Sequence, residues 1–230
     1  MQLSGKVAVV TGSAGGIGGA VAAAFADAGA EVIGLDREQA DLARPDEVEL
    51  FFAGLDRVDV LFNGAGISGR SLGDGPVDEC TVEAWSAVLA NNLTSVFLCS
   101  KHAIPLLREA GGGAIVNLSS AMAISAGDDH FATHAYQVSK GGILTLTRAM
   151  AHHYGRDGIR VNAIAPGLIA TPMSLRAQCD PEIVARLPEL HPLTGDFGRP
   201  DDVAGAAVYL ATAPFVTGAV LAVDGGWSIR

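Results

Sequence analysis

The chain has 230 residues, of which 49% are apolar and 17% are charged, so it is predicted to fold around a sizeable core rather than to stay disordered. Its net charge of −10 argues against a nucleic-acid partner, whose phosphates need a basic surface. The same charge is compatible with a bound anionic cofactor, because helix N-termini and backbone amides hold phosphates without a net positive charge.

Short apolar runs alternate with helical patterns along the chain. The apolar runs predict buried strands at residues 7–10, 31–35, 58–62, 114–118, 161–164 and 219–223. The segments between them predict helices at residues 17–28, 45–55, 82–110, 136–154 and 201–211. This alternation predicts a single α/β domain over residues 1–230, with a doubly wound parallel sheet and helices on both faces.

The segment after the second predicted strand is too short for a complete crossover. Four residues separate Asp36 from Asp41, and a helical pattern already begins at Asp46. A parallel crossover needs about ten residues or more. We therefore expect the sheet to be trimmed at the edge that follows Asp36.

Cysteine usage and hydropathy indicate a cytoplasmic protein without a membrane partner. Cys80, Cys99 and Cys179 show neither paired nor metal-like spacing, which favours reduced thiols. No basic leader or long apolar region precedes the first strand, and no apolar run has the length of a membrane span.

A glycine-rich turn joins the first predicted strand to the first predicted helix. It reads TGSAGGIG over residues 11–18, and in this context such a turn binds a dinucleotide pyrophosphate at the helix N-terminus. Gly12 would allow the tight turn, and Gly16 would let the backbone approach the phosphates. Gly18 would let the helix pack closely against the strand.

An acidic residue stands where the second predicted strand ends. The carboxylate of Asp36 can accept hydrogen bonds from the adenosine ribose, and it repels a 2′-phosphate. This favours NAD over NADP as the cofactor. The neighbouring Arg37 is the counter-argument, because its guanidinium could hold a 2′-phosphate.

Tyr136 and Lys140 stand four residues apart in the run YQVSK. In a helix, this spacing places both side chains on one face. A tyrosine phenol titrates near ~10, and an ammonium held close to it favours the phenolate. Such a pair could exchange a proton near neutral pH, although the same spacing occurs by chance in many helices.

Taken in order, the motifs resemble those of the short-chain dehydrogenase/reductase family, of the classical single-domain type. The resemblance extends from Lys6 to Trp227. It rests on TGxxxGxG at 11–18, NGAG at 63–66 where the family has NNAG, NNL at 91–93, NLSS at 117–120, YxxxK at 136–140, PGLIATP at 166–172, GRP at 198–200 and VDGG at 223–226. It implies hydride transfer between a nicotinamide and a secondary alcohol or ketone.

The resemblance also implies a catalytic set. Tyr136 would be the general acid/base that gives or takes the proton of the reacting oxygen, and Ser120 would hydrogen-bond the same oxygen. Lys140 would bind the nicotinamide ribose and lower the pKa of Tyr136. Asn92 would anchor a water that links Lys140 to solvent.

The cofactor contacts follow from the same resemblance. Gly12, Ile17 and Gly18 would face the pyrophosphate, and Asp36 the adenosine ribose. The remaining contacts would be Asp41 and Leu42 at the adenine, Asn63, Gly64 and Ala65 beneath the adenosine, and Ile169 and Thr171 at the carboxamide.

Ser120 and Tyr136 stand sixteen positions apart, a wider gap than the family usually has. We expect an insertion near 127–131 at the mouth of the active site, where His130 and Phe131 would shape the pocket or contact a neighbouring subunit. His130 and His134 have a spacing that a metal could bridge on a helix, but no third ligand is evident, and we expect no metal.

The segment 173–197 is expected to form a lid over the substrate. Apolar residues around the site suggest a largely apolar pocket: Met122, Ile124, Phe131, Leu168 and Met173. Arg176 on the lid could meet a carboxylate, but no arginine is clearly placed to clamp one. We therefore expect a neutral secondary alcohol or ketone as substrate.

Two alternatives stay open: a non-catalytic dinucleotide sensor on the same fold, and an NADP-dependent ketoreductase. The family is commonly tetrameric and pairs along its long helices. We therefore expect a homo-oligomer, a tetramer or a dimer, that pairs through 82–110 and 136–154.

Overall fold

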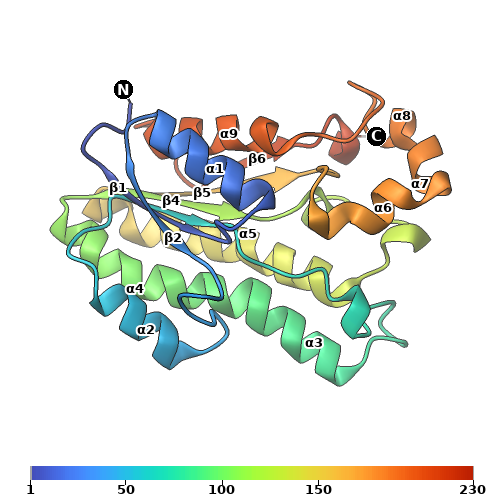
Figure 1. The fold of residues 1–230 in the computed structure, drawn as a ribbon, viewed down its shortest axis with the longest axis horizontal. Coiled ribbons are helices and arrows are strands. Elements are labelled where there is room, and N and C mark those ends of the chain that lie inside the picture. Colours follow the sequence, from blue (N-terminus) through green and yellow to red (C-terminus); the bar gives the residue numbers. More distant parts are fainter. Residues whose placement is uncertain (1, 230) are drawn as a thin grey trace.

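The computed structural model describes residues 2–229, which form a parallel sheet with helices on both faces (Figure 1). The sheet has six strands in the order β2-β1-β3-β4-β5-β6. In chain order they are β1 (Val7–Thr11), β2 (Glu31–Leu35), β3 (Val60–Asn63), β4 (Gly113–Leu118), β5 (Ile159–Pro166) and β6 (Val220–Val223). The predicted doubly wound α/β architecture is confirmed.

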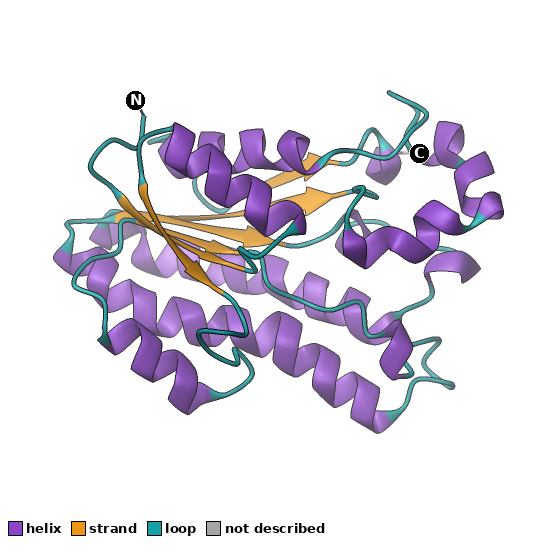
Figure 2. Cartoon of the chain, in the orientation of Figure 1, coloured by secondary structure: helices purple, strands orange, loops and turns teal. Residues whose placement is uncertain are grey.

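The helices cover both faces of the sheet (Figure 2). One layer contains α1 and α9, and the other contains α2, α4 and α5, with α3 packed against α5. The helices are α1 (Gly16–Asp27), α2 (Pro45–Ala53), α3 (Val82–Leu89), α4 (Ser95–Glu109), α5 (His134–Tyr154), α6 (Leu175–Cys179), α7 (Pro181–Ala185), α8 (Leu187–Leu190) and α9 (Pro200–Thr212).

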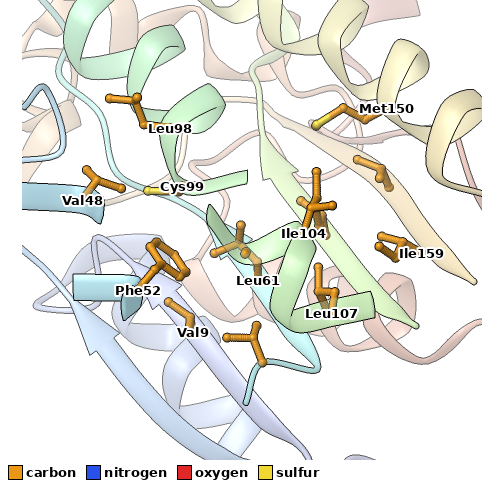
Figure 3. Packing of buried hydrophobic residues seen from close by; sticks show 14 of the residues in the cluster. Val9, Val48, Phe52, Leu61, Leu98, Cys99, Ile104, Leu107, Met150 and Ile159 are labelled. Atoms are coloured by element: carbon orange, nitrogen blue, oxygen red, sulfur yellow. The ribbon is translucent and has the colours of Figure 1, made fainter. Parts of the chain in front are cut away.

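Alternate residues of each strand face opposite layers, because the side-chain period of a strand is two. On β1, Val9 packs beneath α2 and α4, whereas Ala8 and Val10 pack beneath α1 and α9. Figure 3 shows the first of these clusters, in which Phe52 of α2 and Leu107 of α4 close over the sheet. Apolar packing on both faces fixes the register of the central strands.

The sheet ends at β2, as predicted. Between Leu35 and Pro45 the chain forms neither a helix nor a strand, and α2 leads directly to β3 on the far side of β1. In the doubly wound order 3-2-1-4-5-6, a further strand lies outside the second one. Here that strand is missing, because the segment is too short to form it.

The predicted helix over 82–110 contains an irregular turn. Residues Ala90–Thr94 form a π-helical turn between α3 and α4. A π-turn adds one residue to the helical cycle and is frequent at functional sites. It brings the side chain of Asn92 into the interior, where the residue is fully buried.

Candidate active site

A cavity of about 870 Å³ opens at the carboxyl ends of the strands. The chain leaves β1 towards β2 on one side and later returns to β3 on the other, so the crevice between the two directions is the expected ligand site of such a sheet. Fourteen of the predicted site residues line the cavity: Gly12, Gly16, Ile17, Gly18, Asp36, Asp41, Leu42, Gly64, Ala65, Ser120, Tyr136, Lys140, Ile169 and Thr171.

The glycine-rich turn leaves the N-terminus of α1 open to this cavity. Gly12 and Gly16 have positive φ angles of 73° and 56°, and a Cβ atom on Gly12 would lie 3.0 Å from the Ala65 amide nitrogen. Any side chain on Gly18 would collide with the Gly12 carbonyl. The first turn of α1 has no side-chain cap and no acidic residue. Its amides are therefore available to an anionic group, and a pyrophosphate fits this cradle.

The carboxylate of Asp36 faces the glycine-rich turn. It accepts hydrogen bonds from the Ala14 amide at 3.0 Å and from the Arg37 amide at 2.9 Å. Each carboxylate oxygen keeps a lone pair for a further donor. Asp41 and Leu42 line the cavity together with Asp36, so the trimmed edge still supplies a wall at this end.

The segment after β3 is held against the glycine-rich turn by Thr11. Its hydroxyl accepts hydrogen bonds from the amides of Gly64 and Ala65, at 2.9 and 3.1 Å. A side chain on Gly64 would run into the ring of Phe62 and the Thr11 carbonyl. This packing explains why a glycine stands where the family motif has asparagine.

Asn63 does not reach the cavity. Its amide nitrogen donates to Asn117 at 2.8 Å and to Ser100 at 3.2 Å, and the side chain is buried. Asn63 and Asn117 are register partners on β3 and β4. Asn63 therefore links β3 to β4 and does not form part of the cavity wall.

Three polar side chains meet at the Ser120 end of the cavity. Ser120 follows β4, and its side chain lies close enough to the phenol of Tyr136 on α5 to lower the pKa of that phenol. Lys140, one turn further along α5, donates to the Leu118 carbonyl at 2.8 Å, and its nitrogen lies 5.7 Å from the centre of the Tyr136 ring. The spacing of four thus places both side chains in one wall, as expected for a helix.

The pKa of Tyr136 is raised in this structure, whereas the resemblance implied that Lys140 would lower it. Burial raises the pKa of Tyr136 above its ordinary value, and only the neighbouring Ser120 acts in the opposite direction. Lys140, expected to lower the pKa of Tyr136, directs its nitrogen to a backbone carbonyl instead. Burial lowers the pKa of Lys140 itself to about 8.

Asn92 also lies outside the cavity lining. Its side-chain oxygen accepts from the Ile67 amide at 2.7 Å, and its nitrogen donates to Ser139 at 3.2 Å. Gly66 makes this approach possible, because an added Cβ would lie 2.9 Å from the Asn92 oxygen and 3.7 Å from the Lys140 nitrogen. The amide of Asn92 therefore joins the segment after β3 to α5, next to Lys140.

Asp74 is a residue that sequence reasoning missed. Its buried carboxylate accepts hydrogen bonds from the amides of Ala135 and Tyr136, at 3.0 and 2.9 Å. Thr133, the residue before α5, supplies no side-chain cap, so Asp74 takes over this role from a distant segment. It thereby fixes the helix turn that carries Tyr136.

The insertion and the lid pack against each other. Phe131 packs against Trp227 with ring centres 5.0 Å apart, in a cluster with Ala177, Ile183 and Leu190. Asp128 of the insertion forms an ion pair of 2.7 Å with Arg186 of the lid. The segment 173–197, which was expected to form a lid, contains α6, α7 and α8, and these helices lie beyond the arrowheads of the strands in Figure 1.

The pocket wall at this end is partly apolar. Met122, Phe131, Leu168 and Met173 line the cavity as expected, but Ile124 does not and is about half exposed. The Nε2 atom of His130 lies 3.6 Å from the Glu182 carboxylate on the lid. Among residues 2–229, no three His, Cys, Asp or Glu side chains are grouped as metal ligands.

Two family models match the chain. A family model described as enoyl-(acyl carrier protein) reductase matches residues 39–228, and one described as short chain dehydrogenase matches residues 6–51. The chain belongs to the short-chain dehydrogenase family. The resemblance read from the motifs is therefore confirmed.

Family members similar to the chain over its length act on alcohols. A D-threitol dehydrogenase of Mycolicibacterium smegmatis is 36% identical, over 100% of this chain and 95% of that protein. A galactitol 2-dehydrogenase of Cereibacter sphaeroides is 37% identical, over 99% and 97%. A solved structure from Beutenbergia cavernae, described as an NAD(P)-dependent gluconate 5-dehydrogenase with NADP at low occupancy, has a TM-score of 0.90 and 34% identity, over 99% and 98%. The chain is accordingly an oxidoreductase of CH–OH groups that uses a nicotinamide dinucleotide.

Cys80, Cys99 and Cys179 are all free thiols. Burial raises the pKa of the Cys99 thiol to about 12, so this thiol is held in its neutral form. Across residues 2–229, no helix combines the length and the apolar character that crossing a bilayer requires.

Proposed function

We propose that the protein is an NAD-dependent dehydrogenase that interconverts a secondary alcohol and a ketone, with Tyr136 as the general acid/base. The observation that carries this proposal is that Ser120, Tyr136 and Lys140 line the same cavity as the glycine-rich turn. Proton transfer and cofactor binding are thereby served by one cavity.

Bound NAD supplies the hydride acceptor, so the alcohol carbon loses a hydride and the hydroxyl a proton, leaving a ketone, NADH and H⁺. The phenol of Tyr136 takes the hydroxyl proton, or returns it in the reverse direction. Ser120 holds the reacting oxygen beside that phenol. Lys140, Ile169 and Thr171 line the cavity and would hold the nicotinamide half.

The preference for NAD rests on Asp36. Its carboxylate shares the cavity wall with Asp41, and a 2′-phosphate placed there would meet two negative charges. Arg37 lines the same end and favours NADP instead. We propose that the Asp36 carboxylate, which is hydrogen-bonded to the glycine-rich turn, makes NAD the preferred cofactor.

The experiment is a steady-state assay that follows NADH absorbance with a panel of polyols, hydroxy acids and ketones. Turnover with NAD, and a kcat/KM for NAD above that for NADP, would support the proposal. A preference for NADP would overturn the argument from Asp36. Binding of NAD without turnover of any alcohol or ketone would favour the non-catalytic sensor.

We further propose that residues 1–230 act as one cytoplasmic domain that assembles into a homo-oligomer, a tetramer or a dimer. Free thiols support a reducing compartment. A shallow apolar groove between α4 and α5 supports pairing of subunits along these helices. It is lined by Leu93, Thr94, Phe97, Gly142, Thr145, Leu146 and Ala149.

A further inference from the structure

Two arginines from distant segments converge at the Ser120 end of the cavity. Arg70 stands in a short turn after β3, and Arg176 is on α6 of the lid. The Nη2 atom of each donates to the same oxygen, the carbonyl of His130, at 2.9 Å. All three residues line the cavity. Both burial and the nearby charge of Arg176 lower the pKa of Arg70, so the two cations repel each other.

Little negative charge is present to balance this pair. Arg176 reaches Asp180 only at 3.4 Å, and no described carboxylate forms an ion pair with Arg70. Asp74 acts on Arg70 from further away, and both its oxygens are used by amides of α5. In a chain with a net charge of −10, two cations left this poorly matched create a local positive potential.

The two ends of the cavity carry different charges. The carboxylates that line it, Asp36 and Asp41, both lie with the glycine-rich turn. Around Ser120 and Tyr136, the charged lining residues are the cations Arg70, Arg176 and Lys140. Lys140 donates a hydrogen bond to the Leu118 carbonyl. The two arginines are therefore the cations that we expect to contact a substrate.

The guanidinium groups have donors to spare. Each carries five N–H groups in a planar fork. Arg70 uses one of them for His130, and Arg176 uses one for His130 and one for Asp180. The remaining donors suit a carboxylate, which accepts two parallel hydrogen bonds from a guanidinium. The His130 carbonyl shows that a single oxygen can be reached by both arginines at once.

We propose that the substrate is a hydroxy acid or oxo acid whose carboxylate is bound by Arg70 and Arg176 while its reacting carbon lies against Ser120 and Tyr136. This inference rests on the proposed dehydrogenase function. The hydroxyl-bearing carbon gives its hydride to NAD and the hydroxyl proton to Tyr136. The products are the oxo acid, NADH and H⁺, and the carboxylate keeps its bonds and its charge.

The proposal replaces the neutral substrate expected from the sequence. The sequence indicated that Arg176 could meet a carboxylate, but it did not indicate a second arginine near it. Arg70 lies 60 positions before His130, in a turn without any motif. Only the fold brings the two arginines to one oxygen.

The test compares substrates that differ only in the carboxylate. The pairs are gluconate with glucitol and NAD, and 4-oxopentanoate with 4-oxopentanamide and NADH. In the wild-type protein, the carboxylate of a pair should have a kcat/KM roughly ten- to hundredfold above its neutral partner, as expected for a hydrogen bond to a charged group. Arg70→Gln and Arg176→Gln should each bring this ratio towards one, and Arg70→Lys should keep part of it.

A matched control separates charge at the site from charge in general. Arg156→Gln removes the same charge from an exposed position before β5, at the opposite end of the sheet, and should leave the ratio unchanged. A purely structural role of the two arginines, holding the insertion through His130, would lower both members of a pair equally. An unchanged ratio in both glutamine variants would therefore overturn the proposal.

Binding provides a readout that does not depend on turnover. With NADH present, 4-oxopentanoate should raise the Tm of the wild-type protein, and it should do so less in Arg70→Gln and Arg176→Gln. A Tm shift without turnover would support the carboxylate site and count against the proposed function. Turnover of glucitol and 4-oxopentanamide at rates equal to their partners would overturn the carboxylate site and leave the proposed function intact.

Discussion

Tyr136 is held by contacts that come from three parts of the chain. Its phenol meets Ser120 after β4, its backbone amide meets Asp74, and its ring lies beneath Lys140. Spacing and motif predicted the serine and the lysine. Asp74 could not be predicted, because its partner amide lies 62 positions away and its own segment reads as an ordinary turn.

Removing the carboxylate of Asp74 should disturb both folding and catalysis. Asp74→Ala leaves two buried amides of α5 without acceptors, which should reduce the free energy of unfolding by roughly 1–3 kcal/mol. Misplacement of Tyr136 should lower kcat by up to about a hundredfold while the Kd for NAD stays unchanged. Asp74→Asn keeps one acceptor and should be intermediate in both measurements. An alanine variant with wild-type kcat would show that Asp74 does not position Tyr136.

The buried amine of Lys140 should make stability depend on pH. Its pKa is about 8 in the folded protein and about 10.4 when unfolded, so the unfolded chain binds more protons between these values. The free energy of unfolding should therefore rise with pH across this window, by roughly 3 kcal/mol in total. The raised pKa of Tyr136 opposes this rise above about pH 10, where only the unfolded chain loses the phenol proton.

Urea unfolding of the cofactor-free protein between about pH 8 and pH 10 measures this effect. The wild-type free energy of unfolding should increase with pH, and the difference between wild type and Lys140→Met should change by the same amount. Parallel pH profiles for the two proteins would contradict the burial of a neutral amine at this position.

The elements that build the site could be predicted to different extents. The long apolar strands and the 134–154 helix follow from periodicity, and the trimmed edge follows from chain length alone. The π-turn at Ala90–Thr94 could not be predicted, because a shift of one hydrogen bond leaves no mark on composition. The lid helices are short, and their packing depends on Phe131 and Trp227, which are distant in sequence.

The ion pair between Asp128 and Arg186 ties the insertion to the lid at 2.7 Å. Because both side chains are partly exposed, the pair should contribute up to ~1 kcal/mol. Arg186→Gln should therefore raise KM for the substrate by up to about fivefold, with the Kd for NAD unchanged. The matched control is Arg108→Gln, which breaks an ion pair of the same 2.7 Å with Asp157 at the opposite end of the sheet. Equal effects of the two variants on KM would argue against a lid function.

The strand order of the sheet determines where the candidate active site lies. The reversal between β1 and β3 creates the crevice, and the carboxyl ends of β4 and β5 deliver Ser120 and the segment with Ile169 to its other wall. The motifs predicted this arrangement because TGxxxGxG, NLSS and PGLIATP each lie at or after the carboxyl end of a strand. The charge of the substrate end could not be predicted, since it depends on how the loops fold over the sheet.

The apolar groove between α4 and α5 is the surface through which we expect subunits to pair. Phe97 on α4 is 49% exposed in the single chain, although it is a large apolar residue. Phe97→Glu would place a charge within the proposed subunit interface and should shift the protein to a smaller species in size-exclusion chromatography with light scattering. A wild-type protein that is already monomeric would contradict this role of the groove.

The variant Tyr136→Phe tests whether Tyr136 transfers the proton in an NAD-linked oxidation. The variant keeps the ring and its packing but lacks the hydroxyl. Its Kd for NAD, measured by calorimetry, should match the wild type, while kcat from NADH absorbance should fall by roughly 10²- to 10⁴-fold. Turnover within a few-fold of the wild type, with NAD still bound, would show that Tyr136 is not the general acid/base.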